Sequence, residues 1–293
     1  MSLTRPLVIS IASGKGGTGK TTVAMNLARM ASESHRVQIL DCDVEEPNCH
    51  LFAEPDVETK EGVYVPTPSV NADTCSHCSL CAKVCAFHAI VAGPRGVVVL
   101  KELCHGCGAC VALCPTHSLV DQQRNIGSVR SGPSRSCPGV SLTYGSLEPG
   151  EALAAVVISA VRKRASSNAD LILIDSPPGT SCGMVRSVNG SDFCLLVTEP
   201  TPLGLHDLEL AWETATKLGI RTGVVINRAG AARTDAKGFC EQRGIPVLLE
   251  IPLDRRVAEA YAKGQIIVDV LPDCKEGFRD LVHSIVAYGG AQR

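Results

Sequence analysis

A glycine-rich segment close to the start of the chain constrains the fold more than any other feature. Residues 14–22 read GKGGTGKTT and fit the pattern G-x4-G-K-[ST]. The segment follows the short apolar run 7–12 and precedes a stretch of helical periodicity over 20–31. A strand that turns through glycines into a helix is the context in which this pattern binds phosphate. The segment therefore predicts a phosphate-binding loop within an α/β fold.

The rest of the chain repeats this alternation of strand and helix. Short apolar runs, each ending in a polar or turn residue, cover residues 37–40, 171–174, 193–197, 223–226 and 247–251. Helical stretches separate the later runs, over 203–218 and 231–243. This order predicts a doubly wound, mainly parallel sheet, in which ligands bind at the carboxyl ends of the strands.

Each residue type in the glycine-rich segment has a role at a nucleotide. Glycines let backbone N–H groups curl around phosphate oxygens, and the start of the helix adds its positive end. We expect Lys20 to reach the β and γ phosphates and the Thr21 hydroxyl to ligate Mg²⁺. The expected nucleotide contacts in this segment are Gly14, Gly16, Gly17, Thr18, Gly19, Lys20, Thr21 and Thr22.

Lys15 is a second lysine, which a plain phosphate-binding loop does not require. With it, the segment resembles the deviant Walker A motif of the MinD/ParA and nitrogenase iron protein superfamily. In that family the extra lysine reaches across a dimer to the partner's ATP. The resemblance implies the same for Lys15, in an ATP-dependent homodimer or a heterodimer with a related ATPase. It also implies ATP, ADP and Mg²⁺ as ligands, and Lys15, Lys20 and Asp43 as catalytic residues.

Residues 40–43 (LDCD) resemble the end of the switch I strand of that family. The resemblance implies that Asp43 positions or activates the attacking water. It implies that Asp41 helps to hold the shell of water around Mg²⁺. Residues 43–48 (DVEEPN) are most similar to the Mrp-type branch of the family.

Residues 175–180 (DSPPGT) resemble a Walker B motif followed by switch II. The resemblance implies that Asp175 holds Mg²⁺ through water and that the Gly179 N–H senses the γ-phosphate. The positions that resemble the adenine contacts of the family are Asn227, Pro252 and Asp254. Turn formation accounts for these residue types equally well, so both interpretations stay open.

Eight of the fifteen cysteines lie between residues 75 and 114, in two runs that share the spacing C-x2-C-x2-C-x3-C. This is the bacterial ferredoxin pattern for two [4Fe–4S] clusters, in which the fourth cysteine of each run ligates the other cluster. Four-ligand structural zinc is the alternative, and the order of three cysteines plus one favours clusters. The pattern assigns one cluster to Cys75, Cys78, Cys81 and Cys114. It assigns the other to Cys104, Cys107, Cys110 and Cys85.

The cysteine block predicts a second domain inserted into the first. We place an inserted α+β, bacterial-ferredoxin-like domain at 62–123, and a discontinuous ATPase domain at 1–61 and 124–293. Residues 127–150 are rich in Ser, Gly and Pro and predict loops or a short hairpin.

Composition excludes several classes of function. The net charge of −2 argues against a general nucleic-acid binder, and 3% aromatic residues argue against stacking platforms. No apolar run reaches the length of a membrane span, and the N-terminus lacks the features of a signal peptide. We therefore expect a cytoplasmic protein without membrane contact. In that compartment fifteen cysteines fit metal binding better than disulfides.

Taken together, the chain resembles MinD-superfamily ATPases that carry an inserted two-cluster ferredoxin domain. Residues 198–208 (TEPTPLGLHDL) also resemble this group, with no chemical role beyond a strand end and a helix start. The leading hypothesis is a slow, partner-stimulated ATPase whose ATP-dependent dimerisation is coupled to electron transfer through two clusters, toward a redox partner that the sequence does not name. The alternatives are an Mrp-type iron–sulfur carrier and a MinD/ParA-like positioning ATPase with a redox sensor domain.

Three further residues have open roles. Cys182 lies near the position where the nitrogenase iron protein holds a cluster shared by two subunits. A dimer would supply only two such ligands, which disfavours a bridging cluster here. His88 and His117 each follow the fourth cysteine of a run by three residues. They tune a cluster or carry protons, or they are surface residues retained by duplication.

Overall fold

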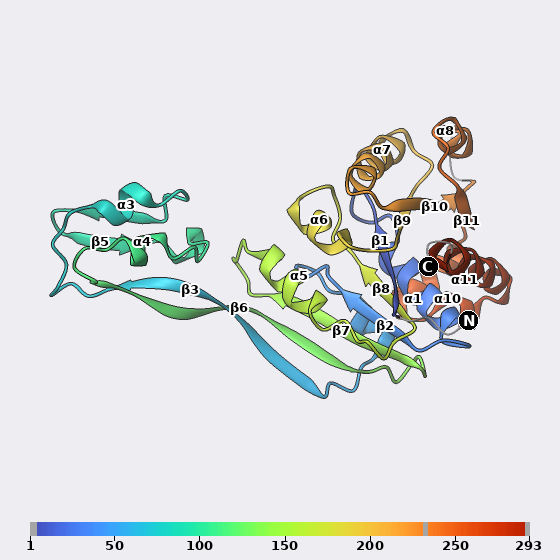
Figure 1. Cartoon of the computed structure of the whole chain (residues 1–293). Coiled ribbons are helices and arrows are strands. Elements are labelled where there is room, and N and C mark those ends of the chain that lie inside the picture. Colours follow the sequence, from blue (N-terminus) through green and yellow to red (C-terminus); the bar gives the residue numbers. More distant parts are fainter. Residues whose placement is uncertain (1–4, 231–233, 291–293) are drawn as a thin grey trace. The chain divides into compact units, whose positions relative to one another are not determined.

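The computed structural model describes residues 5–230 and 234–290, which form two compact units (Figure 1). Among the described residues, the larger unit takes in the chain up to Lys60, Val129–Ser146 and the chain from Ile158. The smaller unit takes in Glu61–Ser128 and Leu147–Val157. The chain passes from one unit to the other within three of its strands, β3, β6 and β7, and within one of its helices, α5.

A nine-stranded sheet has the order β11-β10-β9-β1-β8-β2-β7-β6-β3. Its strands are β1 (Leu7–Ala12), β2 (Val37–Asp41), β3 (Thr59–Val70), β6 (Leu119–Pro133), β7 (Val140–Leu147), β8 (Leu171–Asp175), β9 (Phe193–Thr198), β10 (Arg221–Ala229) and β11 (Val247–Pro252). All the strand pairs from β11 through β7 are parallel. The predicted α/β fold with a mainly parallel sheet is therefore confirmed.

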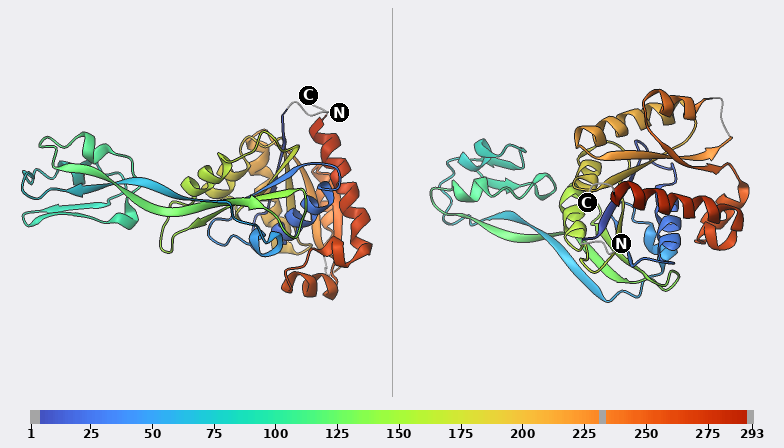
Figure 2. Two further views of the ribbon diagram at one scale, coloured as in Figure 1. Left: turned by 90° about the horizontal axis from the view of Figure 1, so that it is seen from below. Right: turned by 45° about the vertical axis from the view of Figure 1, so that its right-hand side comes forward.

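Helices of the larger unit cover both faces of this sheet (Figure 2). They are α1 (Lys20–Ala31), α2 (Cys49–Ala53), α6 (Cys182–Val188), α7 (Pro202–Lys217), α8 (Ala236–Gln242), α9 (Arg255–Ala262), α10 (Ile267–Val270), the short 3₁₀ helix η2 (Pro272–Cys274) and α11 (Lys275–Gly290). Helix α5 (Ala154–Arg162) spans the boundary between the units. Among the residues that the structure describes, no helix is both long enough and apolar enough to cross a membrane.

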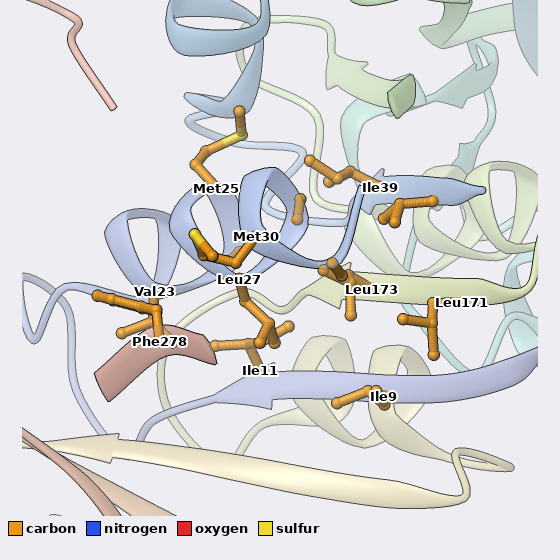
Figure 3. Packing of buried hydrophobic residues seen from close by; sticks show 14 of the residues in the cluster. Ile9, Ile11, Val23, Met25, Leu27, Met30, Ile39, Leu171, Leu173 and Phe278 are labelled. Atoms are coloured by element: carbon orange, nitrogen blue, oxygen red, sulfur yellow. The ribbon is translucent and has the colours of Figure 1, made fainter. Parts of the chain in front are cut away.

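The strands bury both of their faces, which explains their continuous apolar runs. In β9, Leu195 and Val197 belong to the core cluster that includes α1 and α11, whereas Cys194 and Leu196 belong to the cluster under α7. Figure 3 shows the first cluster, where Leu27 of α1 lies over Ile11 and the neighbouring strands.

Of the loops or short hairpin predicted over 127–150, the structure shows the hairpin, and it is longer than expected. Strands β6 and β7 occupy most of this segment and extend the main sheet. The Ser134 N–H donates to Val140 O, and the Glu148 N–H donates to Ile126 O, as in an antiparallel pair. Pairing with a neighbouring strand outweighs the weak strand propensity of Ser, Gly and Pro here.

The helix predicted over 231–243 is present in part, as α8. Residues 231–233 lie outside the described residues. The Asp235 side chain accepts a hydrogen bond from the Gly238 N–H at 2.8 Å and caps the helix start.

The smaller unit is built around the cysteine runs. Besides parts of β3 and β6, it holds the antiparallel hairpin β4 (Ile90–Gly93) and β5 (Gly96–Val99), the short helices α3 (Leu80–Val84) and α4 (Ala109–Ala112), and the 3₁₀ helix η1 (Lys101–Leu103). Ile90, Cys110 and Leu119 form its buried core, and valines and further cysteines pack against them. Because so few apolar side chains are buried, this unit has a small core of its own.

Candidate functional site

The glycine-rich segment forms the turn between β1 and α1. Gly17 and Gly19 have φ values of 75° and 98°, a left-handed conformation that favours glycine. A Cβ atom on Gly19 would lie 2.4 Å from Nδ2 of Asn227. That Nδ2 donates to the Thr18 carbonyl at 2.8 Å. The amide of Asn227 thus holds the loop, and the side chain also lines the cavity described next, so the adenine contact stays a prediction.

A cavity of about 450 Å³ opens at the carboxyl ends of the strands. The predicted site residues that line it are Gly16, Gly17, Gly19, Lys20, Thr21, Thr22, Asp43, Asn227, Pro252 and Asp254. Lining residues that the sequence analysis missed are Glu46, Asn48, Pro178, Arg228, Leu253, Val257, Ala258 and Tyr261. The apolar members of this second group come largely from α9 and from the connection between β11 and α9, so they give the cavity an apolar wall suited to a flat ring.

Of the residues predicted for the nucleotide and Mg²⁺ site, six lie outside this lining: Gly14, Lys15, Thr18, Asp41, Asp175 and Gly179. Gly14 lies against α7, where a Cβ atom would come within 2.0 Å of the Asp207 carbonyl oxygen. The Gly179 N–H, expected to sense a γ-phosphate, donates to Ser13 O at 3.0 Å. Asp254 caps α9 by accepting from the Arg256 N–H at 2.8 Å.

Two aspartates lie side by side beneath the phosphate-binding loop, at the paired ends of β2 and β8. The Thr21 hydroxyl donates to Asp175 Oδ2 at 2.6 Å. Asp41 accepts backbone N–H bonds from Asp43, Asn48 and Cys49 at 3.0–3.1 Å. Both carboxylates are buried, with exposed fractions of 0% and 1% for Asp41 and Asp175.

This burial controls the charge of the site. Burial raises the pKa of Asp41 well above its usual range, and the nearby Asp175 raises it further. Burial also raises the pKa of Asp175, against the hydrogen bond from Thr21. The pKa of Asp43 rises to about 6 because of its burial and of Asp175. Asp43 lines the cavity, and the carboxyl groups of Asp41 and Asp175 are buried beneath the phosphate-binding loop, an arrangement that suits a site that binds a cation.

Glu199 is a site residue that the sequence analysis missed. Its carboxylate accepts from Arg228 Nη1 at 2.6 Å and lies 3.6 Å from Lys15 Nζ. The Glu199 side chain is only 10% exposed. Arg228 lines the cavity and has a left-handed backbone with φ of 56°. The lysine expected to act across a dimer is therefore held within its own chain by Glu199.

In the smaller unit, the eight cysteines of the two runs line two small cavities. The thiols that line one of them belong to Cys75, Cys78, Cys81 and Cys114. Those that line the other belong to Cys85, Cys104, Cys107 and Cys110. The fourth cysteine of each run thus lies with the first three of the other run, in the same grouping that the sequence pattern assigns.

The backbone of the two runs repeats as well. His77 and Ser79 have φ values of 56° and 60°, and Gly106 and Gly108, at the equivalent positions, have 67° and 73°. Successive N–H groups in such conformations turn inward and form a concave surface suited to anions. The first run adopts this backbone without glycine, which strains it.

His88 and His117 share a left-handed φ of 52°. Each N–H donates to the carbonyl of the fourth cysteine of its run, at 3.1 Å to Cys85 and 3.2 Å to Cys114. A turn conformation therefore accounts for their equivalent positions. Cys182 is exposed at the first residue of α6.

Arg124 ties one cysteine cavity to the strands of the same unit. Its guanidinium forms an ion pair with Glu151 and donates to the Cys104 carbonyl at 2.9 Å and to Thr67 Oγ1 at 3.2 Å. The Arg124 and Glu151 side chains are 13% and 12% exposed. No local sequence signal links these residues, which lie far apart along the chain.

Comparison with known proteins agrees with this fold. A family model described as the CobQ/CobB/MinD/ParA nucleotide binding domain matches residues 9–268. The uncharacterized protein MJ0578 of Methanocaldococcus jannaschii is 31% identical over 280 residues, 94% of this chain and 95% of that protein. The cytosolic Fe–S cluster assembly factor NBP35 of Eremothecium gossypii is 28% identical over 124 residues, 36% of this chain and 37% of that protein.

Among solved structures, the septum site-determining protein MinD from Pyrococcus horikoshii, complexed with Mg-ADP, superposes with a TM-score of 0.61. The two chains are 22% identical, and the match covers 98% of this chain and 99% of that one. At this level of identity the likeness to MinD shows a common fold.

Proposed function

Because the chain belongs to the CobQ/CobB/MinD/ParA nucleotide-binding domain family, we propose that it is an ATPase whose ATP-dependent dimerisation controls electron transfer through two [4Fe–4S] clusters. One observation carries this proposal: a single chain combines the nucleotide cavity of this family with two cavities that are each lined by four cysteines. Nucleotide-dependent change and one-electron chemistry thus have separate sites in one molecule.

The nucleotide site fits ATP and Mg²⁺. Left-handed glycines and the start of α1 direct N–H groups at the place of the phosphates. The Thr21 hydroxyl and the Asp175 carboxylate are hard oxygen donors at the same place. Asp175 Oδ1 is buried with no hydrogen-bond partner among the described residues, so it is available to a cation.

Different side chains have different roles in phosphoryl transfer at this site. Lys20 neutralises charge on the β and γ phosphates, and Asp43 orients the attacking water from the segment after β2. Lys15 is released from Glu199 and reaches the nucleotide of the second subunit. The partner is a second copy of this chain or a related ATPase.

The smaller unit fits two [4Fe–4S] clusters. Each cavity offers four thiols, and the inward-facing N–H groups beside them suit an anionic cluster. Such clusters supply one-electron transfer when bound. Arg124 fixes the backbone at Cys104 beside that site, and Glu151 neutralises its charge.

Redox titration followed by electron paramagnetic resonance tests the coupling. The full chain, prepared without oxygen, is titrated with ADP and then with a non-hydrolysable ATP analogue. A shift of about 59 mV corresponds to about 1.4 kcal/mol of coupling between nucleotide and cluster. We expect a shift of this size, and we expect Lys15→Ala to abolish it.

The matched control is Lys163→Ala, which removes an exposed lysine of the same unit. This variant should show the same nucleotide-dependent shift in reduction potential as the wild type. The redox proposal would be refuted if the cluster reduction potentials are the same with both nucleotides and the position of the smaller unit relative to the larger one is also the same with both.

An iron–sulfur carrier of the Mrp type is the second candidate, and the partial match to NBP35 favours it. A carrier needs labile ligands, whereas four thiols for each cavity form a closed set. Transfer of a cluster to an apo-ferredoxin, followed by circular dichroism, would support the carrier. The positioning role stays a prediction, because the likeness to MinD shows the fold.

A further inference from the structure

A buried thiol completes the pair of aspartates beneath the phosphate-binding loop. One ligand atom each from Asp41, Cys49 and Asp175 lies within 4.8 Å of the others. Cys49 Sγ is 3.4 Å from Asp175 Oδ2, and all three side chains are buried. Magnesium takes oxygen ligands and gains nothing from a thiol, so the residue type at 49 is unexplained by the nucleotide site.

One carboxylate oxygen of this group is free to bind a cation. Asp175 Oδ2 already accepts from Thr21 and Cys49, whereas Asp175 Oδ1 is buried and has no partner among the described residues. Leaving a buried carboxylate oxygen unpaired is costly, and a cation is the group that would satisfy it.

The set is also held in place. The backbone N–H groups of Asp43, Asn48 and Cys49 fix both oxygens of Asp41. Outer hydrogen bonds of this kind orient the ligands of metal sites. Because the Cys49 N–H itself binds Asp41, the backbone that carries the thiol is fixed to a second ligand of the set.

We propose that Asp41, Cys49 and Asp175 form a binding site for a borderline-soft divalent cation of the Zn²⁺ class. One thiolate and two carboxylates leave a fourth position of a tetrahedron open for water. On binding, the metal–sulfur bond replaces the S–H bond and the thiol proton passes to solvent. Nothing is oxidised or reduced.

Occupancy of this site competes with Mg²⁺. Both cations use Asp175, so Zn²⁺ weakens Mg²⁺-nucleotide binding and the nucleotide weakens Zn²⁺ binding by the same factor. This regulatory consequence rests on the proposed function, whereas cation binding itself does not. The site would make the ATPase sensitive to free transition metal.

Cobalt is the probe that tests the site, because it replaces Zn²⁺ and a thiolate bound to it absorbs in the near ultraviolet. The full chain is titrated with Co²⁺ as wild type, Cys49→Ala and Cys49→Ser. The control is Cys194→Ala, which removes a thiol that is equally buried in β9, outside this set. The eight cysteines of the smaller unit contribute alike to all four proteins, so differences report on residue 49.

We expect wild type and Cys194→Ala to bind one more Co²⁺ than both Cys49 variants, or to bind it at least about tenfold more tightly. The additional thiolate absorption should fade when Mg²⁺ and an ATP analogue are added. Equal Co²⁺ binding and equal spectra in wild type and the Cys49 variants would overturn the cation site. An extra band that stays unchanged in a protein that binds the Mg²⁺ nucleotide would overturn the competition between the two cations.

The serine variant keeps the test decisive if the alanine variant unfolds, because it preserves size and a hydrogen-bond donor. Binding of a fluorescent ATP analogue is measured on the same samples. A wild type that binds Co²⁺ through Cys49 but binds no nucleotide would refute the proposed function and leave the metal site standing. Normal nucleotide binding with no Cys49-dependent Co²⁺ would do the reverse.

Discussion

The contact between Glu199 and Lys15 makes a prediction about dimerisation. In the chain described here, Glu199 holds Lys15 at 3.6 Å and Arg228 at 2.6 Å. Lys15 must leave this position to reach a second subunit. The substitution Glu199→Gln removes the negative charge and keeps an oxygen that accepts from Arg228. We therefore expect Glu199→Gln to favour the ATP-dependent dimer.

The size of the effect follows from the exposure of the pair. The Lys15 side chain is 30% exposed and its distance to Glu199 exceeds that of a hydrogen bond, so the interaction is partly screened. A pair of this kind is worth about 0.5 kcal/mol. A dimer releases two of them, about 1 kcal/mol in total, which corresponds to a dissociation constant about fivefold lower. The hydrogen bond from Arg228 to Gln at position 199 is no longer assisted by a negative charge, which should lower the stability of each subunit by about 1 kcal/mol.

Sedimentation of the full chain over a range of concentrations, with a non-hydrolysable ATP analogue, measures this constant. Glu209→Gln is the matched control, because it removes the same charge from an ion pair with Arg243 that lies 2.7 Å apart on the surface. It should leave the dimer unchanged. A higher dissociation constant of the dimer in Glu199→Gln would refute the reasoning, because the Glu199 carboxylate would then stabilise the dimer and not the separate chain.

Three further predictions follow from the described contacts. Gly19→Ala should abolish nucleotide binding and lower the free energy of unfolding by about 2 kcal/mol more than Gly219→Ala, as measured by chemical denaturation. Both glycines have a positive φ, but only at Gly19 would a Cβ atom meet a side chain. The rate of ATP hydrolysis should rise with pH through about 6 and then level off, because Asp43 must lose its proton to accept one, and Asp43→Asn should remove this dependence. Arg124→Met should destabilise the smaller unit by about 3 kcal/mol, since Glu151 is left buried without its partner, and the double substitution with Glu151→Leu should recover part of the loss in thermal unfolding.

The central part of the fold could be predicted because its signals are local. Strands such as β1 and β8 are buried on both faces, so their sequences are continuous apolar runs. The glycine-rich turn is also local, because the left-handed backbone at Gly17 and Gly19 excludes most other residues. The grouping of the cysteines follows from their spacing alone.

The edge of the sheet could not be predicted in this way. Residues of β7 are rich in small polar side chains, and their strand conformation comes from pairing with β2, from Val37 with Val140 to Asp41 with Tyr144. The same holds for β3, whose first residues are exposed. Strand formation here depends on partners that are distant along the chain, which composition does not reveal.

Glu199 shows the same limit at the candidate site. It lies at the end of β9, in a segment whose pattern suggests only a strand end and a helix start. Its role comes from the neighbours that the sheet order brings to it, because β9 pairs with both β1 and β10. Lys15 follows the first of these strands and Arg228 belongs to the second. A charge pair between loops becomes visible only when the strand order is known.

The hydrogen bonds of Asp41 suggest how the state of the nucleotide site reaches the rest of the chain. Asp41 begins the segment that carries Asp43, and its carboxylate accepts from the N–H groups of Asn48 and Cys49 at the other end of that segment. Asp41 therefore fixes both ends. A cation on Asp175 changes the charge next to Asp41 and lowers the cost of ionising both carboxyl groups. The segment that carries Asp43 leads through α2 into β3, and β3 leads to the first cysteine run. Under the proposed function, coupling between nucleotide and clusters therefore has a covalent route that begins at Asp41 and Asp43.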